Sequence, residues 1–325
     1  MRAVTFTGAG GNEVVALSDR PDPEPVGEEI LVRVRYAGLN PADIQQRNGN
    51  YPAPPGAPAD IPGLEVSGEI IACGNRVQSW QPGDRVFGLV AGGGLANRVV
   101  VHERCVARVP DSLGEAEGAA VPEAFITAHD AIRSQAALSM GETLLVHGAT
   151  GGVGTAAIQI GLAAGARVIG VSRSPKGRKL IEKLGAHSVP DEGFEDAVAE
   201  ATGGRGADVI LELVGAPHFP GNLEAVAVKG RIVVVGVGAG STSDVSLLRL
   251  MQKRATVRGT VLRARPVEEK GQVLRSFERE VLPHLATGTI NPIIDQTFAS
   301  DRVTDAFDHL GGAGKRGKVL LDFDG

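Results

Sequence analysis

The stretch TLLVHGATGGVGTAAIQI, residues 143–160, determines which fold the rest of the chain must complete. It begins as a short apolar strand, turns through a loop that contains Gly148, Gly151, Gly152 and Gly154, and continues as an apolar helix. Glycines allow a tight turn and let backbone N–H groups approach a pyrophosphate, which the positive end of the helix also favours. An ordinary tight turn is the alternative in a chain with 45 glycines. The position of the loop between strand and helix favours dinucleotide binding.

Short apolar strands recur at a steady interval after this loop. With the first strand included, we expect them at residues 143–148, 166–172, 207–215, 231–238 and 255–262, with helix-like segments between most of them. Near-continuous apolar strands that alternate with helices indicate a parallel sheet covered on both faces. The sequence therefore predicts an α/β, doubly wound nucleotide-binding domain of the Rossmann type.

The first 110 residues follow a different pattern, in which short strands are divided by glycine and proline. Parallel crossover helices are largely missing there, so we expect an irregular β-rich barrel. The exception is residues 40–47, where Asn40 can cap a short helix and Pro41 fits its first turn. The proline-rich residues 51–63 predict a surface loop. After a helix expected at 267–286, a strand, a helix and a final strand follow.

The residues that follow the second expected strand indicate which nicotinamide cofactor is preferred. An NAD-selective site usually carries Asp or Glu about 20 residues beyond the glycine loop, and the segment 172–178, SRSPKGR, has three cations and two serines instead. Such groups attract a 2′-phosphate. We therefore predict NADPH over NADH, the alternative being a solvated basic start of a helix.

Composition excludes several classes of function. The 325 residues carry a net charge of −5 with no basic stripe, which disfavours nucleic acid as a partner. Two cysteines and no apolar run near the roughly 20 residues of a membrane span predict a cytoplasmic protein. The seven histidines are scattered without the spacing of a zinc site, so we expect no metal. His147, on a buried strand, is expected to be a core residue.

Several long segments, in this order along the chain, resemble the zinc-independent quinone oxidoreductase branch of the medium-chain dehydrogenase/reductase superfamily. They are YAGLNPADIQQRNGNYPAPPG, IPGLEVSGEI, WQPGDRVFGL, AGGGLANRVVV, AAVPEAFITAHDAI and VHGATGGVGTAAIQI. The resemblance implies a GroES-like catalytic domain formed by residues 1–122 and 266–325, and an NADP-binding Rossmann domain at 123–265. It also implies a homodimer, formed by pairing of the edge strand at 255–262 or its neighbour at 231–238.

The resemblance also implies a reaction without a metal. Zinc-dependent relatives have a cysteine where this chain has Asn40 and a His-Glu pair where it has Leu64 and Glu65, and the cysteines of the structural zinc lobe are absent. Without that Lewis acid, alcohol oxidation is disfavoured, and hydride transfer from NADPH to a small quinone or activated carbonyl is expected. Asp43 and Glu65 are interpreted as structural anchors.

By resemblance, Asn40 and Tyr51 are the catalytic residues, and Phe125 forms an apolar wall of the substrate pocket. The implied cofactor contacts are Thr127 near the nicotinamide, Ala149, Thr150, Gly151, Gly152 and Val153 at the phosphates, Arg173, Ser174 and Lys176 at the 2′-phosphate, and Val214, Gly215, Gly236, Val237, Gly238, Leu262 and Arg263.

The chemistry expected of the protein is to hold the acceptor and stabilise the oxyanion that develops as hydride arrives. Asn40 and Tyr51 are suitable hydrogen-bond donors for that oxyanion. The same residues would serve a quinone or the enolate of an enal, enone or enoyl thioester, so a C=C reductase stays open as an alternative. A second alternative, of another class, is an NADPH-binding protein with little turnover.

Overall fold

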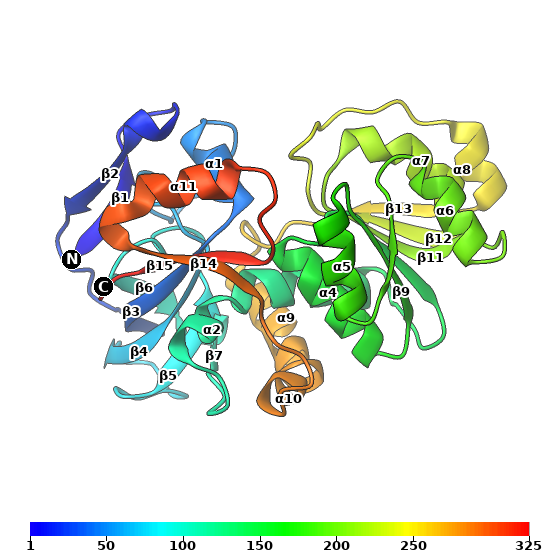
Figure 1. The fold of residues 1–325 in the computed structure, drawn as a ribbon. Helices are drawn as coiled ribbons and strands as arrows, with labels where there is room; N and C mark the ends of the chain where they lie inside the picture. Colours follow the sequence, from blue (N-terminus) through cyan, green and yellow to red (C-terminus); the bar gives the residue numbers. More distant parts are fainter. Residues whose placement is uncertain (325) are drawn as a thin grey trace. The chain divides into compact units, whose positions relative to one another are not determined.

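The computed structural model describes residues 1–324, which form two compact units (Figure 1). The first unit contains Met1–Ile126 and the described residues from Leu262 on, and the second is Thr127–Val261. The junctions each lie four residues from the expected 122/123 and 265/266 boundaries. The reason is local packing: the backbone N–H of Glu123 and the side chain of Arg263 are both hydrogen-bonded within the first unit.

The second unit is the α/β, doubly wound domain that the sequence predicts. Its six strands are all parallel, in the order β10 (His187–Val189), β9 (Arg167–Val171), β8 (Thr143–Val146), β11 (Ala207–Glu212), β12 (Val226–Val234) and β13 (Thr256–Gly259). The short strand β10 was not expected. Because β12 ends at Val234, the glycines at 236 and 238 lie in the loop that follows it.

Helices cover both faces of this parallel sheet (Figure 1). They are α4 (Gly152–Ala163), α5 (Pro175–Lys183), α6 (Phe194–Ala201), α7 (Phe219–Ala225) and α8 (Leu247–Lys253). Phe194 of α6 and Leu223 of α7 pack with Leu145 of β8 in one core cluster. Leu144 points the other way and lies close to Gly161 of α4, as the alternation of side chains along a strand requires.

The first unit is built on a mostly antiparallel seven-stranded sheet, the β-rich domain that the sequence predicts. Its order is β14 (Ile294–Ala299), β15 (Lys318–Asp322), β3 (Glu29–Leu39), β4 (Glu65–Cys73), β5 (Arg85–Leu89) and β7 (Val106–Arg108), with β6 (Arg98–His102) paired to β3. A separate hairpin joins β1 (Arg2–Phe6) and β2 (Val15–Asp19). The pairing of β15 with β3 confirms that the C-terminal segment completes this unit.

The helices of the first unit follow the sequence pattern with one correction. They are α1 (Pro41–Arg47), α2 (Glu115–Ala119), α9 (Val267–Glu280), α10 (Leu282–Ala286) and α11 (Val303–Gly311). The single helix expected at 267–286 is wrong, because the helix ends before Val281 and a new helix begins at Leu282, with Pro283 in its first turn. Single turns complete the list for the first unit: η1 (Asn12–Val14), η2 (Glu103–Cys105), η3 (Pro122–Ile126) and η6 (Ser300–Arg302). The second unit also has the short elements α3 (Thr127–His129), η4 (Asp130–Gln135) and η5 (Ala216–His218).

Two further expectations concern the proline-rich loop and the cysteines. Residues 51–63 form an irregular loop, as the prolines predict, although its last three residues are buried. Both cysteines are free thiols, Cys105 buried and Cys73 half-buried. Within residues 1–324, no helix combines the length and the apolarity needed to span a bilayer.

Candidate active site

The strand order of the second unit marks the place where a ligand would bind. The chain runs from β8 outward to β9 and β10 and then returns to the other side of β8 as β11. The order therefore reverses between β8 and β11, and ligands of doubly wound sheets bind beyond the carboxyl ends of the strands at such a point. The glycine loop follows β8 and Val214 follows β11, so both lie there.

The glycine loop has the geometry that a pyrophosphate requires. Gly148 has a φ of +61°, which favours glycine. A Cβ on Gly154 would lie 2.7 Å from the Cα of Ala149, so only glycine lets the helix pack this closely on the loop. Gly151 is the N-cap of α4 and has no side chain to cap it. The first N–H groups of this helix are thus left for an anion, and the loop fits a dinucleotide phosphate.

The basic residues after β9 are arranged around the start of α5. Ser174 is the N-cap, and its Oγ accepts the backbone N–H of Gly177 at 3.0 Å. Arg173 and Lys176 are exposed. Among the described residues neither side chain has a hydrogen-bond or ion-pair partner, so both cations are available to a phosphate.

The loops after β11 and β12 are held against each other by backbone hydrogen bonds. The N–H of Ala239 donates to the carbonyl of Val214 at 2.9 Å, and the N–H of Gly236 donates to the carbonyl of Glu212 at 3.2 Å. Gly215 has a φ of +116°. Val237, between the two glycines of the second loop, is half exposed at 49 %. Both loops are thus ordered at the carboxyl edge of the sheet.

The remaining predicted cofactor contacts divide between the two units. Thr127 is buried and begins the short helix α3 of the second unit. Leu262 and Arg263 are both 7 % exposed and belong to the first unit.

In the first unit, the side chain of Asn40 lies in a buried polar network. Its Nδ2 donates to Glu65 Oε1 at 2.9 Å and to the Gly38 carbonyl at 3.3 Å. Its Oδ1 accepts from Lys318 Nζ at 2.7 Å, and Lys318 also pairs with Glu65. Both amide hydrogens of Asn40 are therefore used inside the protein, and neither is directed to a substrate in this conformation.

Asp43 and Glu65 both accept hydrogen bonds from backbone N–H groups, in agreement with the interpretation from the sequence that they are structural anchors. Asp43 accepts the backbone N–H of Asn40 at 2.8 Å and of Gly63 at 3.0 Å, which ties the start of α1 to the loop before β4. Burial raises the pKa of Asp43 to about 6, although these two N–H groups oppose the shift. Glu65 accepts the backbone N–H of Glu123 at 2.8 Å.

Tyr51 is held by Arg263. The guanidinium lies over the phenol ring at 5.1 Å from its centroid and donates to the Tyr51 carbonyl at 3.3 Å. Its other bonds go to the Ala91 carbonyl at 2.7 Å and to Gln46 Oε1 at 2.6 Å. Burial raises the pKa of Tyr51, so the phenol stays protonated at neutral pH. Its hydroxyl makes no hydrogen bond to any residue that the structure describes.

Phe125 is 2 % exposed and lies in the turn η3 of the first unit. In the same turn, the backbone N–H of Glu123 donates to Glu65.

Among the described residues, one set of three potential metal ligands comes together, and all three belong to the second unit. His147, Glu212 and His218 are all buried, with ligand atoms within 4.8 Å of one another. The two imidazole rings are stacked, with centroids 4.3 Å apart and an angle of 27° between planes. A metal must lie close to the plane of each imidazole that binds it, and these near-parallel planes do not meet between the rings. The set does not fit a metal.

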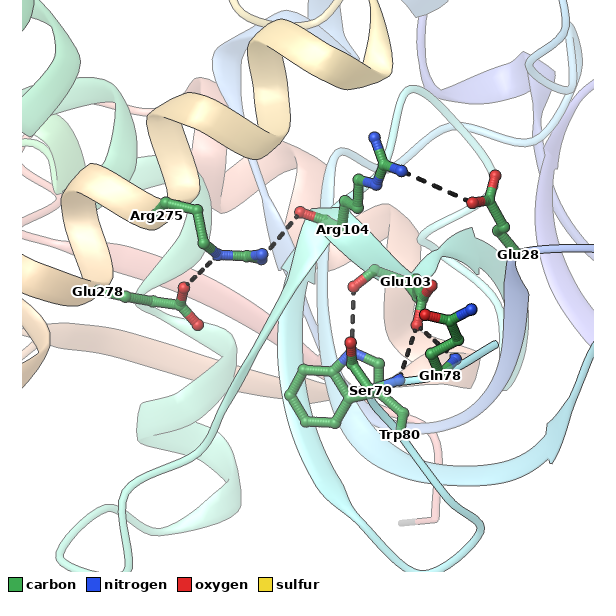
Figure 2. Close-up of a pocket in the computed structure, with 8 residues that line it drawn as sticks. All are labelled: Glu28, Gln78, Ser79, Trp80, Glu103, Arg104, Arg275 and Glu278. Atoms are coloured by element: carbon green, nitrogen blue, oxygen red, sulfur yellow. Dashed lines mark hydrogen bonds and ion pairs between the residues drawn. The ribbon is translucent and has the colours of Figure 1, made fainter. Parts of the chain in front are cut away.

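A surface hollow of about 620 Å³ lies in the first unit, where Figure 2 shows its lining. Arg275 is bonded to Glu278 at 2.6 Å, and Arg104 lies 3.6 Å from Glu28. The buried carboxylate of Glu103 accepts the backbone N–H groups of Gln78 and Ser79. Each of these charges already has a partner inside the hollow, so the hollow is a structural feature of the surface rather than the reaction site.

Sequence reasoning missed Lys318, Glu212 and Asn222. The first two are charged residues in mostly apolar strand segments, KVLLDF and ADVILELVG, and that mismatch is the signal that could have identified them. Asn222 carries no such signal.

Comparisons with known proteins agree with this architecture. The family model for the alcohol dehydrogenase GroES-like domain matches residues 27–111, and that for the zinc-binding dehydrogenase matches residues 152–279. A quinone oxidoreductase of Lama guanicoe is 32% identical over 327 residues, covering 99% of this chain and 97% of the relative.

Two solved structures are similar over the whole chain. A mycobacterial protein complexed with NADPH has a TM-score of 0.89 at 27% identity, covering 99% of this chain and 100% of that one. The CurK enoyl reductase has a TM-score of 0.86 at 25% identity, covering 99% and 98%.

Proposed function

We propose a specific reaction for this chain, which belongs to the quinone oxidoreductase branch of the medium-chain dehydrogenase/reductase superfamily and is an oxidoreductase. The reaction is hydride transfer from NADPH to a quinone, without a catalytic metal. The observation that carries it is the Tyr51 hydroxyl, which is protonated at neutral pH and has no partner among the described residues. A relative that carries the name quinone oxidoreductase over nearly its full length supports the choice of acceptor.

The preference for NADPH rests on charge. Arg173 and Lys176 present two cations, unpaired within residues 1–324, beside the N-cap Ser174, and residues 172–178 hold no carboxylate that would repel a 2′-phosphate. The similar mycobacterial structure contains NADPH, which supports the same choice. The bound cofactor would supply the hydride. The glycine loop would bind the pyrophosphate of the cofactor through Ala149, Thr150, Gly151, Gly152 and Val153. The rest of the cofactor would be contacted by Thr127, Val214, Gly215, Gly236, Val237, Gly238 and Leu262.

Within the first unit, Tyr51 would stabilise the oxyanion. A phenol that donates to the acceptor oxygen strengthens its bond as negative charge develops there, and the proton can follow to give the hydroquinone. Arg263 would hold the ring in place rather than bind the cofactor, since its bonds go to Tyr51, Gln46 and Ala91. Asn40 would hold the buried pair of Glu65 and Lys318 in place, and Phe125 would supply an apolar wall.

The expected zinc independence has its physical support in Lys318. A lysine ammonium donates to Asn40 Oδ1 and to Glu65 Oε1, so a cation already neutralises the carboxylate at this position. A divalent ion there would have to displace that ammonium from a buried site.

A second candidate is the NADPH-dependent reduction of a C=C bond in an enal, enone or enoyl thioester. The similarity to the CurK enoyl reductase favours it, and the same Tyr51 hydroxyl would stabilise the enolate oxygen. A protein that binds NADPH with little turnover is the third candidate.

The test is the loss of NADPH absorbance with 1,2-naphthoquinone, 1,4-benzoquinone, a medium-chain enal and a crotonyl thioester, each repeated with NADH. Turnover of the quinones with NADPH preferred is the expected result. Faster turnover of the enal or thioester would move the assignment to C=C reduction, and tight binding without turnover would favour the third candidate. Tyr51→Phe should lower kcat on the best acceptor about 100-fold to 1000-fold with KM nearly unchanged; an unchanged kcat would remove Tyr51 from this role.

We also propose that the protein is a cytoplasmic homodimer. Strand β13 is the edge of the parallel sheet, and all four of its residues are exposed. Leu247, Leu248 and Met251 of α8 are also exposed, between 65% and 71%. The neighbouring strand β12 lies inside the sheet and cannot pair with a second copy. A monomeric sedimentation value would contradict the proposal.

A further inference from the structure

A buried hydrogen-bond chain connects the strand before the glycine loop with the loop after β11. Glu212, at the end of β11, is completely buried. Its Oε1 accepts the backbone N–H groups of Val214 at 2.7 Å and Gly215 at 2.8 Å, and its Oε2 accepts Asn222 Nδ2 at 2.7 Å. Asn222 Oδ1 lies 2.7 Å from Nε2 of His147, which directly follows β8. One carboxylate thus reaches both sides of the point where the strand order reverses.

The direction of these bonds is determined by chemistry. A carboxylate only accepts, so Asn222 must turn its NH₂ to Glu212 and its carbonyl oxygen to His147. His147 must therefore carry its proton on Nε2. Its Nδ1 is then a bare lone pair, and it has no hydrogen-bond partner among residues 1–324. The pKa of His147 is lowered to about 4, chiefly by burial, so the ring stays neutral at physiological pH.

The loop that this carboxylate holds has a conformation that needs support. Gly215 has a φ of +116°, and a Cβ there would lie 2.8 Å from the Cα of Val237. The two N–H groups bound by Glu212 are those of this glycine and the residue before it. The backbone carbonyl of Glu212 accepts the N–H groups of Val235 and Gly236 as well. Glu212 therefore organises both loops at the cofactor edge.

We propose that Glu212 is a positioning residue for the dinucleotide: its carboxylate, oriented by Asn222 and His147, holds the loop at 214–215, and its backbone carbonyl holds the start of the loop at 236–238, so that both loops keep the form that binds the cofactor. The inference rests on the proposed function, because it assumes that these loops contact NADPH. Glu212 itself is buried beneath the loops and touches their backbone, not the ligand.

The test begins with Glu212→Gln. The Oε1 atom of the new glutamine can still accept from Val214 and Gly215, but its Nε2 would face the NH₂ of Asn222, donor against donor. The Asn222 amide must then turn over, and His147 must present a lone pair at Nε2 and move its proton to Nδ1. We expect NADPH to bind at least 10-fold more weakly, measured by nicotinamide fluorescence, and the ¹⁵N shifts of histidine-labelled protein to report the other tautomer of His147.

A second variant restores the direction of every bond. When Glu212→Gln is combined with Asn222→Asp, the introduced glutamine donates to one oxygen of the introduced aspartate and His147 donates to the other, and one negative charge remains. We expect NADPH affinity within about 3-fold of the natural protein and His147 back in the Nε2–H tautomer. The matched control is Glu200→Gln, an exposed glutamate of α6 that makes no side-chain hydrogen bond within the described residues; its affinity should not change.

The outcomes separate this inference from the proposed function. If the natural protein binds no NADPH, the proposed function has failed and the inference fails with it. If the natural protein binds and Glu212→Gln binds equally well, only the inference is wrong. If the double variant folds and has the Nε2–H tautomer but binds as weakly as the single variant, the hydrogen-bond chain does not position the loops. If the single variant does not fold, recovery of folding and affinity in the double variant supports the inference, and folding without affinity contradicts it.

Discussion

Lowering the pH should destabilise the second unit through His147, and replacing this residue with glutamine should remove that effect. The imidazole is completely buried and bonded to Asn222. Burial is the main reason why its pKa falls from 6.5 to about 4, and the neighbouring charge of Glu212 only partly opposes it. The unfolded chain therefore takes up a proton near pH 6.5, whereas the folded chain takes it up only near pH 4.

The sign and size of the effect follow from proton linkage. Between these two pKa values the unfolded state holds more protons, so acid favours unfolding, and the stability present above pH 6.5 is lost as the pH falls towards 4. With 6.5 and about 4 as the two values, the free energy of unfolding should fall by about 2 kcal/mol from pH 7 to pH 5.

Glutamine is the matched variant because its Nε2 can take the place of the imidazole Nε2 and donate to Asn222 without titrating. The assay must report the second unit alone, and the single tryptophan and both tyrosines lie in the first. Hydrogen exchange of peptides from β8 and β11 across a urea series provides that signal. We expect the stability of the natural protein relative to His147→Gln to be about 2 kcal/mol lower at pH 5 than at pH 7. Parallel pH profiles for the two proteins would refute the reasoning.

Three other changes give distinct results. Arg173→Ala should weaken NADPH binding about 10-fold, through loss of one charge-assisted bond to phosphate, and leave NADH binding unchanged; an equal loss for both cofactors would contradict the 2′-phosphate role. Lys318→Met leaves Glu65 buried without its cation. Tryptophan fluorescence in urea should therefore show the first unit destabilised by about 3 kcal/mol. A change below about 1 kcal/mol would show that water or a proton replaces the ammonium. Gly154→Ala should abolish the increase in melting temperature caused by NADPH, because the added methyl group would lie 2.7 Å from the Cα of Ala149. Normal NADPH binding by this variant would mean that the loop shifts without loss of its phosphate site.

The sequence correctly predicted those parts of the fold that a local pattern of residues specifies. Apolar strands between helices identified five of the six parallel strands, and Asn40 and Pro41 identified the start of α1. The missed strand β10 has only three residues, too short for a periodic signal. The break at Val281 was missed because the apolar spacing continues through it and the proline follows two residues later.

The candidate site was less predictable because its contacts join distant parts of the chain. Lys318 and Glu65 are 253 residues apart, and they meet only because β15 pairs with β3 beside β4. The guanidinium of Arg263, a residue that the resemblance assigns to the cofactor site, lies on Tyr51, 212 residues away. A single sequence carries no local signal for either pairing.

Two buried carboxylates, Glu65 and Glu212, organise the two units by different physical means. Glu65 accepts neutral N–H groups of Asn40 and Glu123, and in addition the ammonium of Lys318 neutralises its charge. Glu212 is stabilised by three neutral N–H donors, while the nearest ring nitrogens of His147 and His218 lie at 3.9 and 3.7 Å, beyond hydrogen-bond distance. Burial would raise the pKa of Glu212, but its histidine neighbours and these N–H groups together lower it. The first unit should therefore respond most to removal of a cation, and the second to reversal of hydrogen-bond direction, which is the difference that Lys318→Met and Glu212→Gln would reveal.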